Sequence, residues 1–224
     1  MRRFYSVAGC CAIGMGMFAL LLFSRPVQAE MYVAGQIGAH MPNDASNVEY
    51  SALGASVGGS DLALQNSLMY GAKLGYYFDS VKLGNLNLGI ETEVFNATPH
   101  LKQQVATIGG FTGTVEGLTN RVLTWAPVVV LVRYQAGAFE PYAGVGLGVF
   151  FSRLALGNFS SSSTDVGLNT QVGIRYRVNQ NLSLFTEWKY NYANISHGNF
   201  IGIPVDFSYN YNAHIVAGGI GYHF

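Results

Sequence analysis

Charged residues are scarce in this sequence. Lysine, arginine, aspartate and glutamate make up 11% of its 224 residues, whereas soluble domains carry about 25%. Half of the residues are hydrophobic, so a soluble protein of this composition would have little charge with which to cover its surface. The 12 basic and 12 acidic residues balance one another, and nothing indicates the basic surface of a nucleic-acid-binding protein.

Cysteine is nearly absent. Cys10 and Cys11 are the only two, and both lie in the N-terminal segment 1–29. If that segment is removed, the remaining chain has no thiol. Neither a disulfide framework nor a cysteine-based metal site is then possible.

The N-terminal segment has the layout of a secretory signal peptide. Arg2 and Arg3 precede an apolar stretch over residues 7–23, and small residues lead to Ala29. We therefore predict a signal peptide over residues 1–29, with cleavage between Ala29 and Glu30. A retained membrane anchor is the alternative.

Long hydrophobic runs are missing from the predicted mature chain. The longest uninterrupted run covers residues 126–132, far shorter than the roughly 20 residues of a membrane-spanning helix. Aromatic and β-branched residues are plentiful, which excludes a disordered chain. An apolar chain without long apolar runs is typical of a sheet that faces lipid with every second residue.

Apolar residues alternate with small or polar ones along much of the chain. In residues 167–178, for example, Leu168, Ile174 and Tyr176 share one parity and Arg175 has the other. Such segments predict β-strands long enough to cross a bilayer when tilted. Eight strands are predicted: 30–39, 67–79, 86–95, 127–135, 141–154, 167–178, 182–192 and 213–224. The predicted fold is all-β, an eight-stranded antiparallel up-and-down transmembrane β-barrel formed by one domain, residues 30–224.

The connections between these strands alternate in length. Three are short: 79–85, 136–140 and 179–181. Four are long: 40–66, 96–121, 155–166 and 194–208. Short periplasmic turns opposite long extracellular loops are typical of outer-membrane barrels. We expect the polar stretch 157–164 to be a mobile loop, and we expect Pro127 to mark a strand start or a bulge above the bilayer.

The polar parity of the strands carries most of the charges. For Arg133 alone the parity is left open. If the apolar parity faces lipid, these charges form a network in the lumen: Lys73, Glu91, Glu93, Arg133, Arg175, Arg177, Glu187 and Lys189.

A soluble periplasmic ligand-binding barrel of the lipocalin type is the main alternative, because it alternates with the apolar side inward. Eight strand charges are too few to cover such a barrel. Glycines such as Gly75 and Gly173 share the charged parity, which suits a narrow lumen. Aromatic residues such as Tyr76 and Tyr176 gather near the strand ends, where interfacial girdles lie. The sequence therefore favours the membrane barrel.

Two charge pairs are expected inside the barrel. Lys73 and Glu93 should meet across one hairpin, and Arg175 and Glu187 should be diagonal neighbours across another. Isolated charges in a narrow lumen are unfavourable, so these groups should pair. The pairs would form either a static core or a gate for small ions.

An enzyme that modifies lipid A is a further alternative, which would need a His, Ser and acid constellation at the outer rim. Ser196 and His197 are the only adjacent pair of that kind there, and sequence neighbours rarely form a triad. The five histidines lack metal-ligand spacing. We predict no enzymatic activity, no catalytic, metal-binding or cofactor-binding residues, and no cofactor.

Three segments, 140–151, 172–192 and 214–224, resemble strands of the outer-membrane β-barrel domain family, the OmpA-like eight-stranded group that includes opacity-type surface proteins. The resemblance implies a surface protein of a Gram-negative outer membrane, with a structural, adhesion-type or narrow porin-like role.

The resemblance also implies partners. Ile220, Tyr222 and Phe224 would form the signal that the barrel-assembly machinery reads. The barrel would contact outer-membrane lipid, and its long loops could bind a host surface or another envelope component. We expect a monomer that binds no nucleic acid.

Overall fold

The computed structural model describes residues 29–52, 55–100, 102, 104–108, 111–115, 119–156, 159–198 and 206–224. The predicted signal peptide lies outside the described residues, apart from Ala29. Within the described part of the chain, no helix is long and apolar enough to cross a membrane.

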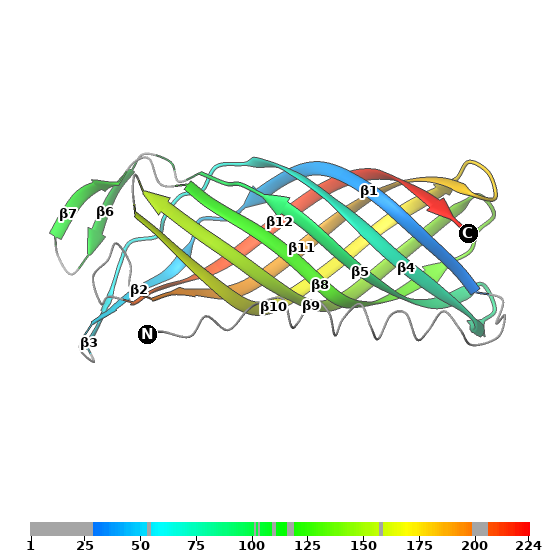
Figure 1. The fold of residues 1–224 in the computed structure, drawn as a ribbon, viewed down its shortest axis with the longest axis horizontal. Helices are drawn as coiled ribbons and strands as arrows, with labels where there is room; N and C mark the ends of the chain where they lie inside the picture. The colour runs from blue at the N-terminus through cyan, green and yellow to red at the C-terminus, as the bar shows by residue number, and fades with distance from the viewer. Residues whose placement is uncertain are drawn as a thin grey trace, which may run out of the picture.

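Eight antiparallel strands close into a barrel (Figure 1). They are β1 (Ala29–Pro42), β4 (Ser67–Leu83), β5 (Leu86–Ala97), β8 (Thr119–Tyr134), β9 (Phe139–Leu156), β10 (Phe159–Arg177), β11 (Leu182–His197) and β12 (Asp206–His223). Each strand pairs with its sequence neighbour in the ring, and β1 pairs with β12 from Tyr32↔His223 to Pro42↔Ala213. The ring confirms the predicted eight-stranded up-and-down barrel.

The strands are longer than predicted. An 18-residue strand such as β9 measures about 60 Å, and at a tilt of about 40° it rises about 45 Å. The apolar band of such a barrel is only about 25 Å tall. The prediction of a loop over 157–164 is wrong for the described residues, because β10 already begins at Phe159. Likewise, β12 begins at Asp206 rather than at residue 213.

Two predicted loops contain further strands. In the first, β2 (Ser46–Ala52) and β3 (Ala55–Gly58) extend the sheet from the outer part of β12. In the second, β6 (Gln104–Ile108) and β7 (Phe111–Val115) form a separate hairpin at the same end of the barrel (Figure 1).

Backbone hydrogen bonds join these two segments. The amide of Gln65 donates to the carbonyl of His100 at 2.8 Å, and the amide of Lys102 donates to that of Ala63 at 3.0 Å. The two segments therefore support each other above the barrel. The opposite end has only short turns, two of which place Gly84 and Gly137 at positive φ.

Pro127 lies in a bulge within β8. The pairing of β8 with β9 shifts between Trp125 and Val128, and its pairing with β5 shifts between Glu91 and Glu93. The expected bulge is therefore present, because proline has no ladder donor. However, β8 does not start there, and the bulge does not lie above the bilayer. Trp125 continues the exposed apolar face beyond it.

The outside of the barrel is apolar. Residues of one parity on all eight strands are exposed, and they include Ile37, Leu147, Val172 and Ile220. The opposite parity is buried in the lumen and holds the charged residues of the predicted network. This arrangement is the inverse of a lipocalin and excludes the soluble alternative.

Large rings in the lumen lie over glycines of the neighbouring strand. Tyr32 is paired with Gly75, and Tyr142 with Gly173. A Cβ atom on Gly75 would come within 2.2 Å of the Tyr32 ring, and one on Gly173 within 2.7 Å of the Tyr142 ring. The same relation holds for Tyr77 over Gly89 and for Phe185 over Gly219. The glycines therefore make room for specific rings.

Replacing Gly75 by alanine should displace Tyr32 and destabilise the barrel. Overpacking of a close-packed interior typically lowers stability by about 1–3 kcal/mol. Gly35→Ala is the matched control, because a Cβ there has nothing within 4 Å. The check is the urea midpoint of unfolding in detergent, and equal midpoints for the two variants would contradict this account of the glycines.

Candidate functional site

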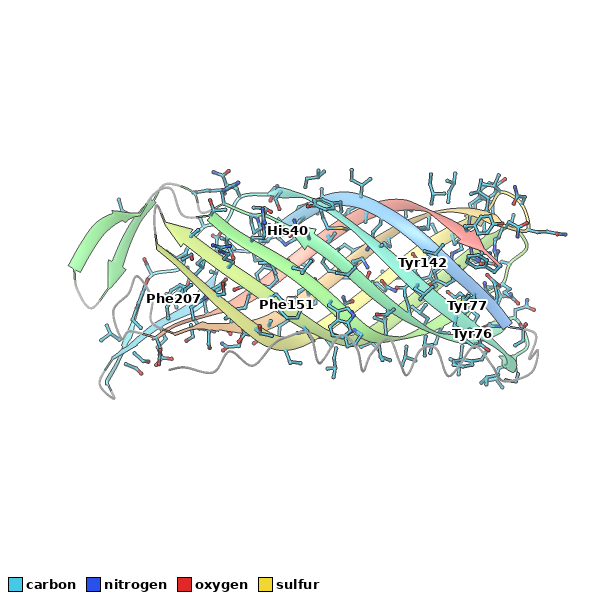
Figure 2. The ribbon with its side chains drawn as sticks, viewed as in Figure 1. His40, Tyr76, Tyr77, Tyr142, Phe151 and Phe207 are labelled. Atoms are coloured by element: carbon cyan, nitrogen blue, oxygen red, sulfur yellow. The ribbon has the colours of Figure 1, made fainter. Side chains whose placement is uncertain are left out.

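The candidate site is the interior of the barrel, where polar and apolar layers alternate. In Figure 2, His40 and Phe207 lie toward the end that carries the β6–β7 hairpin, whereas Tyr77 and Tyr142 lie toward the short turns. The lumen also contains two clusters of charged residues. We call them the central network and the basal network. The central network consists of Lys73, Glu91, Glu93, Glu187 and Lys189, and the basal network of Glu30, Arg133, Glu140, Arg175 and Arg177.

Lys73 is at the centre of the central network. Its Nζ lies 2.7 Å from Oε2 of Glu187 and 3.2 Å from Oε1 of Glu91. The carboxylate of Glu93, directly across the hairpin, is 3.6 Å away. Lys189 forms an ion pair with Glu93 and a second one, at 3.1 Å, with Glu187. Each lysine thus binds carboxylates from more than one strand.

Neutral side chains complete this network. The Oε1 atom of Gln171 accepts hydrogen bonds from Lys73 at 3.1 Å and from Lys189 at 2.9 Å, while its amide donates to Glu91 at 2.8 Å. Tyr142 donates to Glu187 at 2.8 Å, and Tyr32 donates to Glu91. The rings positioned by glycine thus hold the carboxylates in place.

The basal network lies nearer the short turns. Glu30 of β1 reaches across the lumen to Arg133, at 2.9 Å, and to Arg177. Glu140 contacts both arginines as well, at 3.2 and 3.3 Å. Arg175 lies 3.9 Å from Glu140, and its guanidinium carbon is 4.3 Å from the centre of the Tyr32 ring.

The two networks neutralise one another. The central network has two lysines and three glutamates, a net charge of −1, and the basal network has three arginines and two glutamates, a net charge of +1. Tyr32 joins them, because its hydroxyl binds Glu91 and its ring faces Arg175. Five cations and five anions are therefore enclosed together in the lumen.

All eight residues predicted for the lumen face inward, but their partners differ from those expected. Arg175 does not contact Glu187; its direct neighbour on β11 is Phe185, and it stacks on tyrosines instead. Barrel curvature brings Glu187 to the lysines. Glu30 and Glu140 are two further lumen acids that were not predicted from the sequence. Both share the parity of inward residues on their strands, which could have identified them.

The outer end of the lumen is filled by apolar side chains. The outer apolar cluster combines four residues of the segment after β1 with inward residues of four barrel strands, β8, β9, β11 and β12. Its members are Ala45, Val48, Leu62, Leu64, Val122, Phe150, Leu154, Ala193, Ile195, Phe207, Tyr209, Tyr211 and Ala213. The segment after β1 therefore folds back into the barrel mouth and closes it.

A serine and a histidine meet beside this cluster. The partner of His197 is Ser152, whose Oγ lies 2.9 Å from Nε2, and not the adjacent Ser196, which is exposed on the outside. Ser152 also lies 3.2 Å from Ser163, which donates to Asp165 at 2.6 Å.

This arrangement differs from a catalytic triad. Asp165 binds Ser163 and not the imidazole, and Nδ1 of His197 has no hydrogen-bond partner among the described residues. Ser152 and His197 are both buried. Among the described residues, no group of three or more His, Cys, Asp or Glu side chains is placed to hold a metal ion.

Removing one charge of the central network should destabilise the barrel strongly. Lys73→Met leaves three carboxylates with one lysine, and breaking a buried ion pair typically lowers stability by about 3–5 kcal/mol. The double variant Lys73→Met/Glu187→Gln restores the net charge and should recover part of the loss. Lys102→Met, at an exposed position, is the control. The measurement is urea unfolding followed by tryptophan fluorescence. If Lys73→Met were as stable as the wild type, the central network would not stabilise the barrel.

Comparisons with known proteins agree with this architecture. The family model for the outer membrane protein beta-barrel domain matches residues 15–224. The crystal structure of OprG from Pseudomonas aeruginosa is similar, with a TM-score of 0.62, 16% identity, and coverage of 88% of this chain and 96% of that one. Neisserial surface protein A is similar with a TM-score of 0.51, 16% identity and coverage of 87% and 97%. At these identities the likeness shows the fold alone. No curated protein sequence matches the chain.

Proposed function

Because the chain belongs to the outer membrane protein β-barrel domain family and spans the outer membrane of a Gram-negative bacterium, we propose that it is a closed surface barrel. Its lumen is a structural core, and its outer end displays the β2–β3 and β6–β7 segments. The observation that supports this most directly is the filled interior. Lys73, Glu93 and Lys189 are almost inaccessible to water even though they are charged.

Two levels of the lumen are closed. Together with the contact between His223 and Glu30, the ion pairs of the two networks involve all eight barrel strands. Above them, the outer apolar cluster fills the mouth with mainly apolar side chains. Opening a passage would require charges to separate in a medium of low dielectric constant, which is unfavourable. A static core therefore explains the geometry better than a gate.

Planar-bilayer recording tests this proposal. The wild-type protein should give no stepwise conductance, and neither should Glu187→Gln, in which the central network loses a charge but the outer apolar cluster is intact. Circular dichroism and heat-modifiable migration on gels establish that each sample is folded. Stable single-channel steps from the folded wild type would overturn the closed barrel and support a narrow porin-like role.

The displayed segments supply the interaction surface in this proposal. The strand β3 is the last in its sheet order and β6 pairs only with β7, so both segments present backbone edges to the outside. Partners would be a host surface or another envelope component. We propose no enzymatic role, because the imidazole of His197 has no carboxylate partner in the described part of the chain and Ser152 is buried. We also propose that the barrel is monomeric.

The closing strand is proposed as the signal for the barrel-assembly machinery. Its outward residues Ile220, Tyr222 and Phe224 are exposed on the lipid side, and the Phe224 side chain is 66% exposed. The Phe224 ring packs on Tyr222, while its backbone amide donates to Met31 at 2.9 Å. A side chain this exposed contributes little to the stability of the folded barrel.

Phe224→Ala should therefore separate assembly from stability. In cells, export should be normal, whereas the amount of folded barrel in the outer membrane should fall several-fold. In detergent, the purified variant should refold with a urea midpoint close to that of the wild type. Val172→Ala, which also shortens an exposed lipid-facing side chain, is the control. Equal membrane levels for Phe224→Ala and the wild type would contradict the assembly role.

A further inference from the structure

Two arginines stand side by side on the outer wall of the barrel. Arg121 of β8 and Arg153 of β9 are directly opposite each other in the ladder, and both are exposed. They belong to the lipid-facing parity, which is otherwise almost free of charge. Within the described residues of the eight barrel strands, the one other outward formal charge is Asp206 on β12. That strand is not adjacent to β8 or β9 in the ring.

The two arginines have no counter-ion among the residues that the structure describes. Among the described residues, no carboxylate lies within ion-pair distance of either guanidinium group, in contrast to every arginine of the basal network. Arg153 makes a long hydrogen bond, 3.4 Å, to the neutral hydroxyl of Ser160. Like charges directly opposite on a sheet destabilise it. An anion that bridges the pair would relieve this repulsion.

The residues below the pair face hydrocarbon. Leu123 is paired with Phe151, and Trp125 with Val149, in the next two outward rows toward the membrane centre (Figure 2 labels Phe151). Leu123, Phe151 and Trp125 are between 36% and 40% exposed. The outer surface of β8 and β9 is thus cationic at the two arginines and apolar below them. This pattern matches a lipid with an anionic headgroup above its acyl chains.

The height of the pair fits the headgroup layer of the outer leaflet. Along β9, Arg153 lies 14 residues beyond Phe139, an aromatic residue at the short-turn end. At about 3.3 Å per residue and a tilt of about 40°, this corresponds to a rise of about 35 Å. The hydrocarbon core is about 30 Å thick and the whole bilayer about 40–45 Å. Arg153 therefore stands just outside the hydrocarbon.

We propose that Arg121 and Arg153 form a binding site for the phosphate group of a phosphorylated glycolipid in the outer leaflet. Two adjacent guanidinium groups can each bind phosphate oxygens in bidentate fashion. Ser162, directly opposite Arg153 on β10, and Ser160 add hydroxyl donors. Leu123, Phe151 and Trp125 contact the acyl chains. The site goes beyond the closed-barrel function and does not depend on whether the lumen conducts.

The test measures lipid retention by the folded, full-length barrel in phosphatidylcholine nanodiscs. Bisphosphorylated lipid A and its dephosphorylated form are the probes, and native mass spectrometry counts the bound lipid. The wild type should retain the phosphorylated form at least tenfold better. Arg121→Gln/Arg153→Gln should lose this preference, and Arg121→Lys/Arg153→Lys should keep part of it, since lysine keeps the charge without the bidentate geometry.

Lys102→Gln is the matched control, because it removes one exposed cation at the same end of the barrel without touching the pair. It should bind like the wild type. The proposal is overturned if the double glutamine variant retains lipid A as well as the wild type does, or if Lys102→Gln loses as much. It is also overturned if inorganic phosphate at millimolar concentration displaces the lipid completely, since the site would then bind a free ion.

Discussion

A charge enclosed in a narrow barrel cannot be hydrated, and much of this structure follows from that constraint. Five cations and five anions share the lumen, and most of them contact partners on several strands. Lys73 alone connects β4 to β5 and β11. The neutral partners are positioned just as specifically, because Tyr32 and Tyr142 reach their carboxylates only where Gly75 and Gly173 leave space. The positions of the glycines, the tyrosine rings and the ion pairs therefore depend on one another.

The fold could be predicted from the sequence to a large extent. Alternation assigned the lipid face and the lumen face, since a strand of the wrong parity would place lysine in hydrocarbon. The positions at which the strands begin and end were harder to predict. The polar segments beyond the apolar band have the composition of loops, yet residues 159–166 continue β10 because their neighbours on β9 supply hydrogen bonds. Polar composition indicates exposure to water. It does not distinguish a loop from a strand that extends above the membrane, because both are exposed.

Which residues face the lumen was easier to predict than which of them contact one another. Pairing across one hairpin placed Lys73 opposite Glu93 correctly, because register within a hairpin is local. Arg175 and Glu187 are even closer in sequence, but they take different partners, since barrel closure brings side chains from distant strands nearer. The contact between Ser152 and His197 likewise joins strands that are not adjacent in the sheet order. The curvature of the barrel sets the distances between side chains on non-adjacent strands, and no local sequence pattern indicates that curvature.

The position of Glu30 has a consequence for how the barrel is completed. It lies near the start of β1, while its partners come from β8, β10 and the closing strand, where Nδ1 of His223 is 2.7 Å from its carboxylate. This cluster can form only after the first and last strands have met in the correct register. A slip by two residues would leave the inward or outward orientation of every side chain unchanged, but it would move Glu30 away from Arg133, Arg177 and His223. The contacts of Glu30 thus favour the correct register of β1 against β12, which the alternation of apolar residues does not by itself specify.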